Sequence, residues 1–284
     1  MPCQNWNLKP FQREVLDIFL EFVRICEKYK LMYFAIGGTA LGAIRHKGFI
    51  PWDDDFDVAL PREDFNKFVD VVRSELPAHL KFFRGGETKH SPIFFSKIIN
   101  VRDDIILRMR RETGLDFDFS PFIDIFVIDG VPENVFELKK WWNGRRMLRF
   151  CQVYRYPQSF YAPNIKRKGI RFMLRVVGFF VSLFYPRTKN NEEMMRLIDL
   201  FSMRWSYGKS GSVTEVAFFK MKTSRIFPKN IFEPPQTVPF ENTTICVPHC
   251  FDEYLRRFYG DYMVPPPVEC QIPEHLFKKA FNHV

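Results

Sequence analysis

The chain has no aspartate or glutamate between Leu138 and Asn191. That stretch carries 13 lysines and arginines, whereas the formal net charge of the whole 284-residue chain is +9, so the remainder sums to −4. The positive charge is therefore concentrated in one region. Such a concentration is expected for contact with an anionic partner.

The cysteines have no regular spacing. Six of them stand at positions 3, 26, 151, 246, 250 and 270, and a chain of this length does not need a disulfide framework. The first residues, MPCQNWNLKPFQREV, also lack the apolar segment of a signal peptide. We therefore expect a protein of the reducing cytoplasm.

The sequence has no apolar run long enough to span a bilayer in its basic region. The run from Val176 to Tyr185 contains only ten uninterrupted residues. It is interpreted either as a buried core helix or as an interfacial helix, with the basic residues of 166–187 facing anionic headgroups on the inner face of the membrane. The missing acidic residues favour the second interpretation.

Repeats, coiled-coil patterns and clear linkers are absent, so the hydrophobic pattern decides the organisation. It predicts a mixed α/β core with a helical insertion. Helices are expected at 11–30, 134–152, 170–184, 192–207 and 251–258, and strands at 31–36, 55–60, 94–98, 105–109 and 122–128. The 33 phenylalanines imply a large aromatic core or an exposed apolar surface, which the sequence does not distinguish.

Carboxylates are concentrated where the chain reads GGTALGAIRHKGFIPWDDDFD, from Gly37 to Asp57. Residues i and i+2 of a strand face the same side, so Asp55 and Asp57 point together and Asp53 can join them from the preceding turn. Adjacent carboxylates are costly to bury unless a cation lies between them, and oxygen ligands suit Mg²⁺ or Mn²⁺. Asp124, alone in the apolar strand FIDIFVI, becomes a third ligand if the two strands are neighbours.

The Gly37–Gly38 turn complements these carboxylates. Glycines let backbone N–H groups approach a phosphate, and a helix that Thr39 would cap adds a favourable dipole. Arg45 and Lys47 would neutralise further negative charge. An acidic cluster is more often a solvated surface, but the coincidence of the turn, the alternating carboxylates and Asp124 favours a site for a metal-bound nucleotide diphosphate.

Three segments resemble the LicD family: GGTALGAIRHKGFIPWDDDFDVALPREDF at 37–65, FIDIFVIDGVP at 122–132 and DEYLRRFYGDYMVPPP at 252–267. Members of this family transfer phosphocholine or a related alcohol phosphate from a CDP-activated donor to glycans such as lipopolysaccharide, teichoic acid or capsule. The resemblance covers the N-terminal half and the C-terminal end, whereas residues 135–240 match nothing specific.

The resemblance implies an α+β fold, with a nucleotidyltransferase-like mixed sheet flanked by helices. We expect a catalytic core at 1–135, a basic helical insertion at 136–215 and a C-terminal segment at 216–284 that packs back on the core as a strap. Catalytic and metal-binding roles fall on Asp55, Asp57 and Asp124, with Asp53 as a supporting acid. Gly37 and Gly38 match the donor-phosphate turn, joined by Thr39, Arg45 and Lys47, and Tyr259 and Asp261 are candidate donor contacts.

The predicted reaction moves an alcohol phosphate from CDP-choline or a CDP-polyol to a hydroxyl of a surface glycan, with Mg²⁺ or Mn²⁺, and releases CMP. The acceptor is expected to be anionic or lipid-linked. One alternative is a DxD-type glycosyltransferase that uses a sugar nucleotide, which fits the glycine turn and Asp124 less well. The other is a nucleic-acid-binding protein, which is disfavoured because no recognised RNA or DNA motif accompanies the basic stretch.

Overall fold

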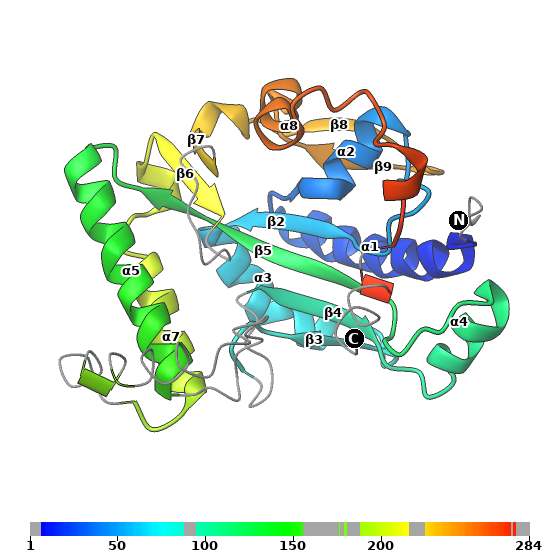
Figure 1. Cartoon of the computed structure of the whole chain (residues 1–284), viewed down its shortest axis with the longest axis horizontal. Coiled ribbons are helices and arrows are strands. Elements are labelled where there is room, and N and C mark those ends of the chain that lie inside the picture. Colours follow the sequence, from blue (N-terminus) through cyan, green and yellow to red (C-terminus); the bar gives the residue numbers. More distant parts are fainter. Residues whose placement is uncertain are drawn as a thin grey trace.

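The computed structural model describes residues 7–87, 95–155, 176, 179–180, 188–215, 225–273 and 275–276. Within these ranges the chain forms a mixed sheet flanked by helices, as predicted (Figure 1). The helix expected at 170–184 lies outside the described residues, apart from Val176, Phe179 and Phe180. No helix of the described ranges combines the length and apolar character that a membrane crossing requires.

Seven strands form the main sheet around β5 (Phe122–Val131), which is buried at all ten positions. On one path the order is β1 (Phe34–Ala35), β2 (Asp57–Pro61), β5, β4 (Ser96–Asn100) and β3 (Leu80–Phe83). Strand β6 (Ser212–Glu215) pairs with β5 and with β7 (Ile226–Pro228). Only the β2–β5 pair is parallel among these pairs.

Helices α1 (Lys9–Tyr29) and α3 (Arg62–Glu75) pack against the sheet (Figure 1). Helix α2 (Gly37–Arg45) contacts α8 (Phe251–Tyr259) and the hairpin of β8 (Gln236–Phe240) and β9 (Thr243–Val247). Helices α5 (Val135–Arg155) and α7 (Asn191–Ser202) pack on each other. Short 3₁₀ helices are η2 (Tyr207–Lys209), η4 (Lys229–Ile231) and η5 (Val268–Cys270).

The phenylalanines of the described residues mainly build the core. Burial of such large rings is the main stabilising contribution of the interior. The rings pack in pairs. Phe11 stacks on Phe117 with ring centroids 4.7 Å apart, and the ring centroids of Phe19 and Phe56 lie 4.9 Å apart. The most deeply buried phenylalanines come from helices, strands and loops along the chain: Phe11, Phe19, Phe22, Phe34, Phe56, Phe68, Phe117, Phe227, Phe232 and Phe240.

Two predicted elements differ from the structure. The strand expected at 105–109 is wrong, because Ile105–Thr113 forms helix α4, in which Ile105, Met109 and Thr113 are buried at a spacing of four. That spacing is the period of a helix face, and Gly114 in the left-handed conformation ends the helix. Strand β5 also continues beyond the predicted end at residue 128 to Val131, which brings Asp129 into the sheet.

The division into three parts stays a prediction. Helices α5 and α7 lie in the expected insertion, whereas β6, at its C-terminal boundary, belongs to the main sheet. The C-terminal segment packs back on the core through α8, whose Tyr254 and Leu255 are buried.

Candidate active site

Three carboxylates meet where β2 and β5 run side by side. Asp57 begins β2 and is the register partner of Asp124 on β5, while Asp55 lies two residues before Asp57. One oxygen from each of the three lies within 4.8 Å of the others. The parallel pairing of these two strands therefore brings together the side chains that the sequence predicted as metal ligands.

The concentrated negative charge of this cluster favours binding of a cation. Oδ1 of Asp57 is buried without a hydrogen-bond partner. Burial raises the pKa of Asp57 well above its ordinary value, with further increases from Asp55 and Asp124. Burial also raises the pKa of Asp124 to about 7, although Lys97 opposes the shift. Carboxylate oxygens at this separation suit Mg²⁺ or Mn²⁺, so the residues fit the predicted metal.

Lys97 is a site residue that the sequence analysis missed. It lies on β4 opposite Asp124 and forms an ion pair with Oδ1 of that side chain. Its Nζ lies 3.6 Å from the ring centroid of Phe122. A single lysine in an ordinary strand pattern carries no sequence signal, because its contact with Asp124 depends on the pairing of β4 with β5.

The glycine turn is pressed against two of the aspartates. Gly37 has φ +55°, and a Cβ there would lie 3.1 Å from Oδ2 of Asp57; at Gly38 a Cβ would lie 2.8 Å from Oδ2 of Asp53. A larger residue is therefore disfavoured at Gly37 by its left-handed backbone conformation, and at Gly38 by crowding against the Asp53 carboxylate. Close approach of the backbone to the carboxylates fixes the start of α2 beside the metal-ligand cluster.

Thr39 has a different role from the predicted helix cap. Helix α2 begins at Gly37 with Ile36 as its N-cap residue, so Thr39 lies inside the first turn. Its Oγ1 accepts a 2.8 Å hydrogen bond from the backbone N–H of Asp57. The prediction of a Thr39 cap is wrong because the turn starts two residues earlier, and the hydroxyl instead ties α2 to β2.

A buried tyrosine stands behind the turn. The N–H of Gly37 donates to the hydroxyl of Tyr254 at 3.1 Å, and that hydroxyl donates to Glu215 at 3.2 Å. Burial raises the pKa of Glu215 to about 7, against the effects of Arg225 and Tyr254. Because the N–H of Gly37 is engaged, the remaining first-turn N–H groups of α2, at Gly38 and Thr39, are the donors that a phosphate would meet.

The structure does not bring the two predicted phosphate-binding cations to the carboxylates. Arg45 donates to the carbonyl of Tyr262 at 2.8 Å and, through Nε, to His46 at 2.9 Å. Lys47 is exposed, with its carbonyl accepting the N–H of Glu241. Their role in donor binding stays a prediction, whereas Lys97 forms an ion pair with Asp124 of the cluster.

Asp53 and Asp54 have separate environments. Burial raises the pKa of Asp53 to about 8, with further increases from Asp55 and Asp54. The buried Asp54 instead accepts backbone N–H bonds from His275 at 3.1 Å and Leu276 at 2.9 Å. Asp54 therefore anchors residues 275–276 of the C-terminal segment, which the sequence analysis did not foresee.

The two candidate donor contacts after α8 lie differently. The hydroxyl of Tyr259 lies 3.9 Å from the position of a Cβ at Gly37. Tyr259 as a whole is 43% exposed, and partial burial, followed by Asp57 and Asp53, raises its pKa. Asp261 is exposed. Tyr259 thus borders the predicted donor turn, whereas the role of Asp261 stays a prediction without a contact to the site in the described residues.

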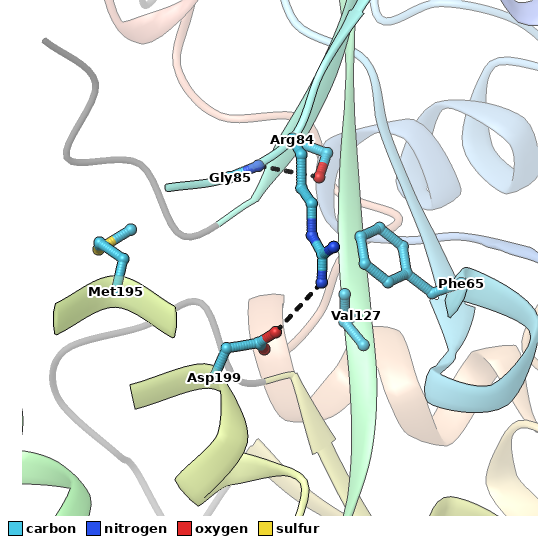
Figure 2. A pocket seen from close by; sticks show the side chains of 7 residues that line it. Phe65, Arg84, Gly85, Val127, Met195 and Asp199 are labelled. Atoms are coloured by element: carbon cyan, nitrogen blue, oxygen red, sulfur yellow. Dashed lines mark hydrogen bonds and ion pairs between the residues drawn. The ribbon is translucent and has the colours of Figure 1, made fainter. Parts of the chain in front are cut away.

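A pocket on the other face of β5 is distinct from this site. It is lined by Phe65, Arg84, Gly85, Ser96, Val127, Met195 and Asp199. Figure 2 shows the guanidinium of Arg84 directed at Asp199, and the two side chains lie 3.6 Å apart. Because Val127 is three residues after Asp124, its side chain points to the opposite face of the strand. This pocket therefore does not open onto the three carboxylates.

Two cations of the basic stretch are not available to a partner. Arg145 and Arg149 of α5 are only 2% and 5% exposed. Nε of Arg145 donates to Ser202 on α7 at 2.9 Å. These two side chains are therefore buried and do not belong to the basic surface expected for this stretch.

A mixed sheet that joins three carboxylates to a glycine turn defines a nucleotidyltransferase-like catalytic domain. The family model described as LicD/FKTN/FKRP, nucleotidyltransferase domain, matches residues 30–176. The lipopolysaccharide cholinephosphotransferase LicD of Haemophilus influenzae is 31% identical over 286 residues, covering 95% of this chain and 96% of that protein. The chain belongs to the LicD family, which confirms the resemblance predicted from the motifs.

Shorter similarities were found to two uncharacterized proteins. That of Rickettsia typhi is 42% identical over 45 residues, which cover 16% of this chain and 15% of that protein. That of Rickettsia prowazekii is 49% identical over 37 residues, which cover 13% and 14%. These segments are too short to carry a statement about function.

Proposed function

We propose that this protein is a LicD-type phosphotransferase that moves phosphocholine or a related alcohol phosphate from a CDP-activated donor to a glycan hydroxyl. The observation that carries the proposal is the meeting of Asp55, Asp57 and Asp124 within 4.8 Å, with Oδ1 of Asp57 buried and unpaired. The proposal is supported by family membership and by the full-length similarity to a protein named lipopolysaccharide cholinephosphotransferase.

The residues divide the work of the reaction. Asp55, Asp57 and Asp124 would hold Mg²⁺ or Mn²⁺, which supplies charge neutralisation at the donor phosphates. The N–H groups of Gly38 and Thr39, at the start of α2, would bind a phosphate oxygen. These groups fix one end of the donor diphosphate, so that its distal phosphorus faces the acceptor.

The transfer step exchanges one phosphorus–oxygen bond for another. The acceptor hydroxyl oxygen bonds to the distal phosphorus, the bond from that phosphorus to the bridging oxygen breaks, and CMP leaves with the electron pair. Asp53, which lies beside Gly38 and outside the three-carboxylate cluster, would accept the proton of the hydroxyl in its ionised form, which the charge of a bound cation favours.

The acceptor is proposed to be an anionic or lipid-linked glycan. Helix α5 exposes Phe136 and, within the acid-free stretch that begins at Leu138, Lys139, Lys140 and Arg146. A basic and aromatic surface of this kind suits an anionic lipid interface. Of the predicted membrane-facing segment 166–187 the structure describes Val176, Phe179 and Phe180, which are 40%, 62% and 57% exposed. Flotation with anionic but not with neutral liposomes is expected; absence of flotation with anionic liposomes would exclude membrane docking, and equal recovery with both would exclude recognition of the anionic headgroups.

A donor screen tests the proposed reaction. Purified protein with Mg²⁺ and a surface-glycan extract is incubated with CDP-choline, CDP-glycerol, CDP-ribitol or a UDP-sugar, and the products are identified by mass spectrometry. We expect CMP and an acceptor heavier by one alcohol phosphate with a CDP donor. Release of UDP with a glycosylated acceptor would instead establish the DxD-type glycosyltransferase. The screen also identifies the alcohol, since each donor adds a different mass.

A further inference from the structure

Asp57, Asp124 and Lys97 form a row across three neighbouring strands. Asp124 on β5 is the register partner of Asp57 on β2 and of Lys97 on β4. Side chains of directly paired residues lie on the same face of a sheet. Lys97 therefore borders the candidate metal site on its β4 side, where its ammonium forms an ion pair with Oδ1 of Asp124.

Two aromatic rings hold this ammonium in place. Phe122 precedes Asp124 by two residues and Phe95 precedes Lys97 by two, so both rings share the face of the row. The Lys97 Nζ lies 3.6 Å from the ring centroid of Phe122 and 5.1 Å from that of Phe95. Aromatic faces attract a cation without supplying a formal negative charge. The side chain of Lys97 is 18% exposed, so it is shielded but reachable.

A cation bound by the three carboxylates would free the ammonium of Lys97 to bind an anion. In the described part of the chain, the ion pairs that Asp55, Asp57 and Asp124 make with lysine or arginine come from Lys97 alone. A divalent cation bound by the three carboxylates would share the negative charge of Asp124. The attraction between Asp124 and Lys97 would then weaken, and the ammonium would favour another anionic oxygen nearby.

We propose that Lys97 binds a non-bridging phosphate oxygen of the nucleotide-activated donor. The inference rests on the proposed function, because it takes the donor diphosphate as the ligand of the site. The ammonium donates a charge-assisted hydrogen bond and forms no covalent bond during transfer. Lys97 is thereby a donor-binding residue, in the place that the sequence assigned to Arg45 and Lys47.

Binding of CDP, which carries no transferable alcohol phosphate, tests this inference without turnover. Isothermal titration calorimetry with saturating Mg²⁺ compares wild type with Lys97→Met, Lys97→Arg and Lys81→Met. Lys81 is exposed on the neighbouring β3 and serves as the matched control. We expect Lys97→Met to weaken CDP binding roughly 10- to 100-fold, Lys97→Arg to remain within about fivefold, and Lys81→Met to bind as wild type.

Mg²⁺ titrations without CDP separate donor binding from a structural role. If Lys97→Met alters Mg²⁺ affinity but binds CDP normally once Mg²⁺ saturates, Lys97 only orients Asp124 and the inference is wrong. Lys97→Gln, which retains a polar side chain, is measured in parallel, and thermal unfolding checks that each variant is folded. Absence of CDP binding by wild type would overturn the proposed function as well, whereas unchanged CDP binding by both Lys97→Met and Lys97→Gln overturns this inference alone.

Discussion

Asp124 and Asp129 stand near the two ends of β5 and point to opposite faces of the sheet, because their separation is odd. Both are buried, at 3% and 0% exposed. Asp129 accepts two 2.6 Å hydrogen bonds from Arg62, whose Nη2 also lies 2.9 Å from Asp199. Asp124 instead shares its surroundings with Asp55 and Asp57, and it has one lysine beside it.

The difference separates a structural carboxylate from a functional one. Burial alone would lower the pKa of Arg62, but Asp129 and Asp199 outweigh that effect and raise it, as expected for an ion-paired guanidinium. At Asp57, burial and then the like charges of Asp55 and Asp124 raise the pKa, and Oδ1 of this side chain is buried without a hydrogen-bond partner. A folded chain retains such uncompensated charge mainly where a ligand completes the balance.

The largest expected effect comes from removing one charge of the cluster. Asp57→Asn or Asp55→Asn should lower transfer from the CDP donor roughly a thousandfold, because a metal ligand is lost while the shape is kept. Thermal stability should stay equal or rise, since like-charge repulsion decreases. Initial rates and melting temperatures are compared with Asp103→Asn, which alters an exposed aspartate. Near-normal transfer by the cluster variants would exclude their catalytic role.

Changes at the ion pair of Asp129 and Arg62 should lower stability and leave transfer activity nearly unchanged. Arg62→Met leaves Asp129 buried without its main counter-ion and should lower the free energy of unfolding by about 3 kcal/mol. The double variant Arg62→Met/Asp129→Asn should recover part of this loss, because no uncompensated charge remains. Urea denaturation measures both, and transfer by the folded fraction should stay within about threefold of wild type. Loss of activity without loss of stability would contradict the assignment of this pair as structural.

The same contrast explains what the sequence could predict. Asp55 and Asp57 were identified from their alternation, and Asp124 from its isolation in an apolar strand, since local spacing carries that information. Asp129 was missed because the strand was expected to end at residue 128. Its partner Arg62 begins α3, so their contact arises from the packing of that helix on the sheet.

Long-range pairing also hid several residues around the site. Lys97 reaches Asp124 only through the β4–β5 register, and Glu215 reaches Tyr254 only because β6 and α8 converge behind Gly37. Tyr254 did lie within the C-terminal motif, which was a signal that the sequence offered. The mixed sheet was predictable from alternating elements, whereas the helix at Ile105–Thr113 was mistaken for a strand because its apolar residues are few.

A smaller effect should distinguish the two regions by their response to metal and pH. When a chelator keeps the protein free of metal, burial and neighbouring carboxylates raise the pKa of Asp124 from 3.8 to about 7 and that of Asp53 from 3.8 to about 8. Between about pH 4 and pH 8 the unfolded chain therefore releases protons that the folded protein retains. Stability of the metal-free protein should fall across this window and level off above it, because the ionised form is favoured in the unfolded state.

Mg²⁺ should offset that loss where the carboxylates are ionised. At about 100 times its dissociation constant, Mg²⁺ should raise the melting temperature by about 5 °C at pH 8, with a smaller increase at pH 5.5 because protons compete for the same oxygens. Differential scanning fluorimetry measures both values. Arg62→Met should keep the increase and Asp57→Asn should lose it. If Mg²⁺ raised the melting temperature of Asp57→Asn as much as that of wild type, the ion would bind elsewhere. Asp124 and Asp129 would then no longer differ as a functional and a structural carboxylate.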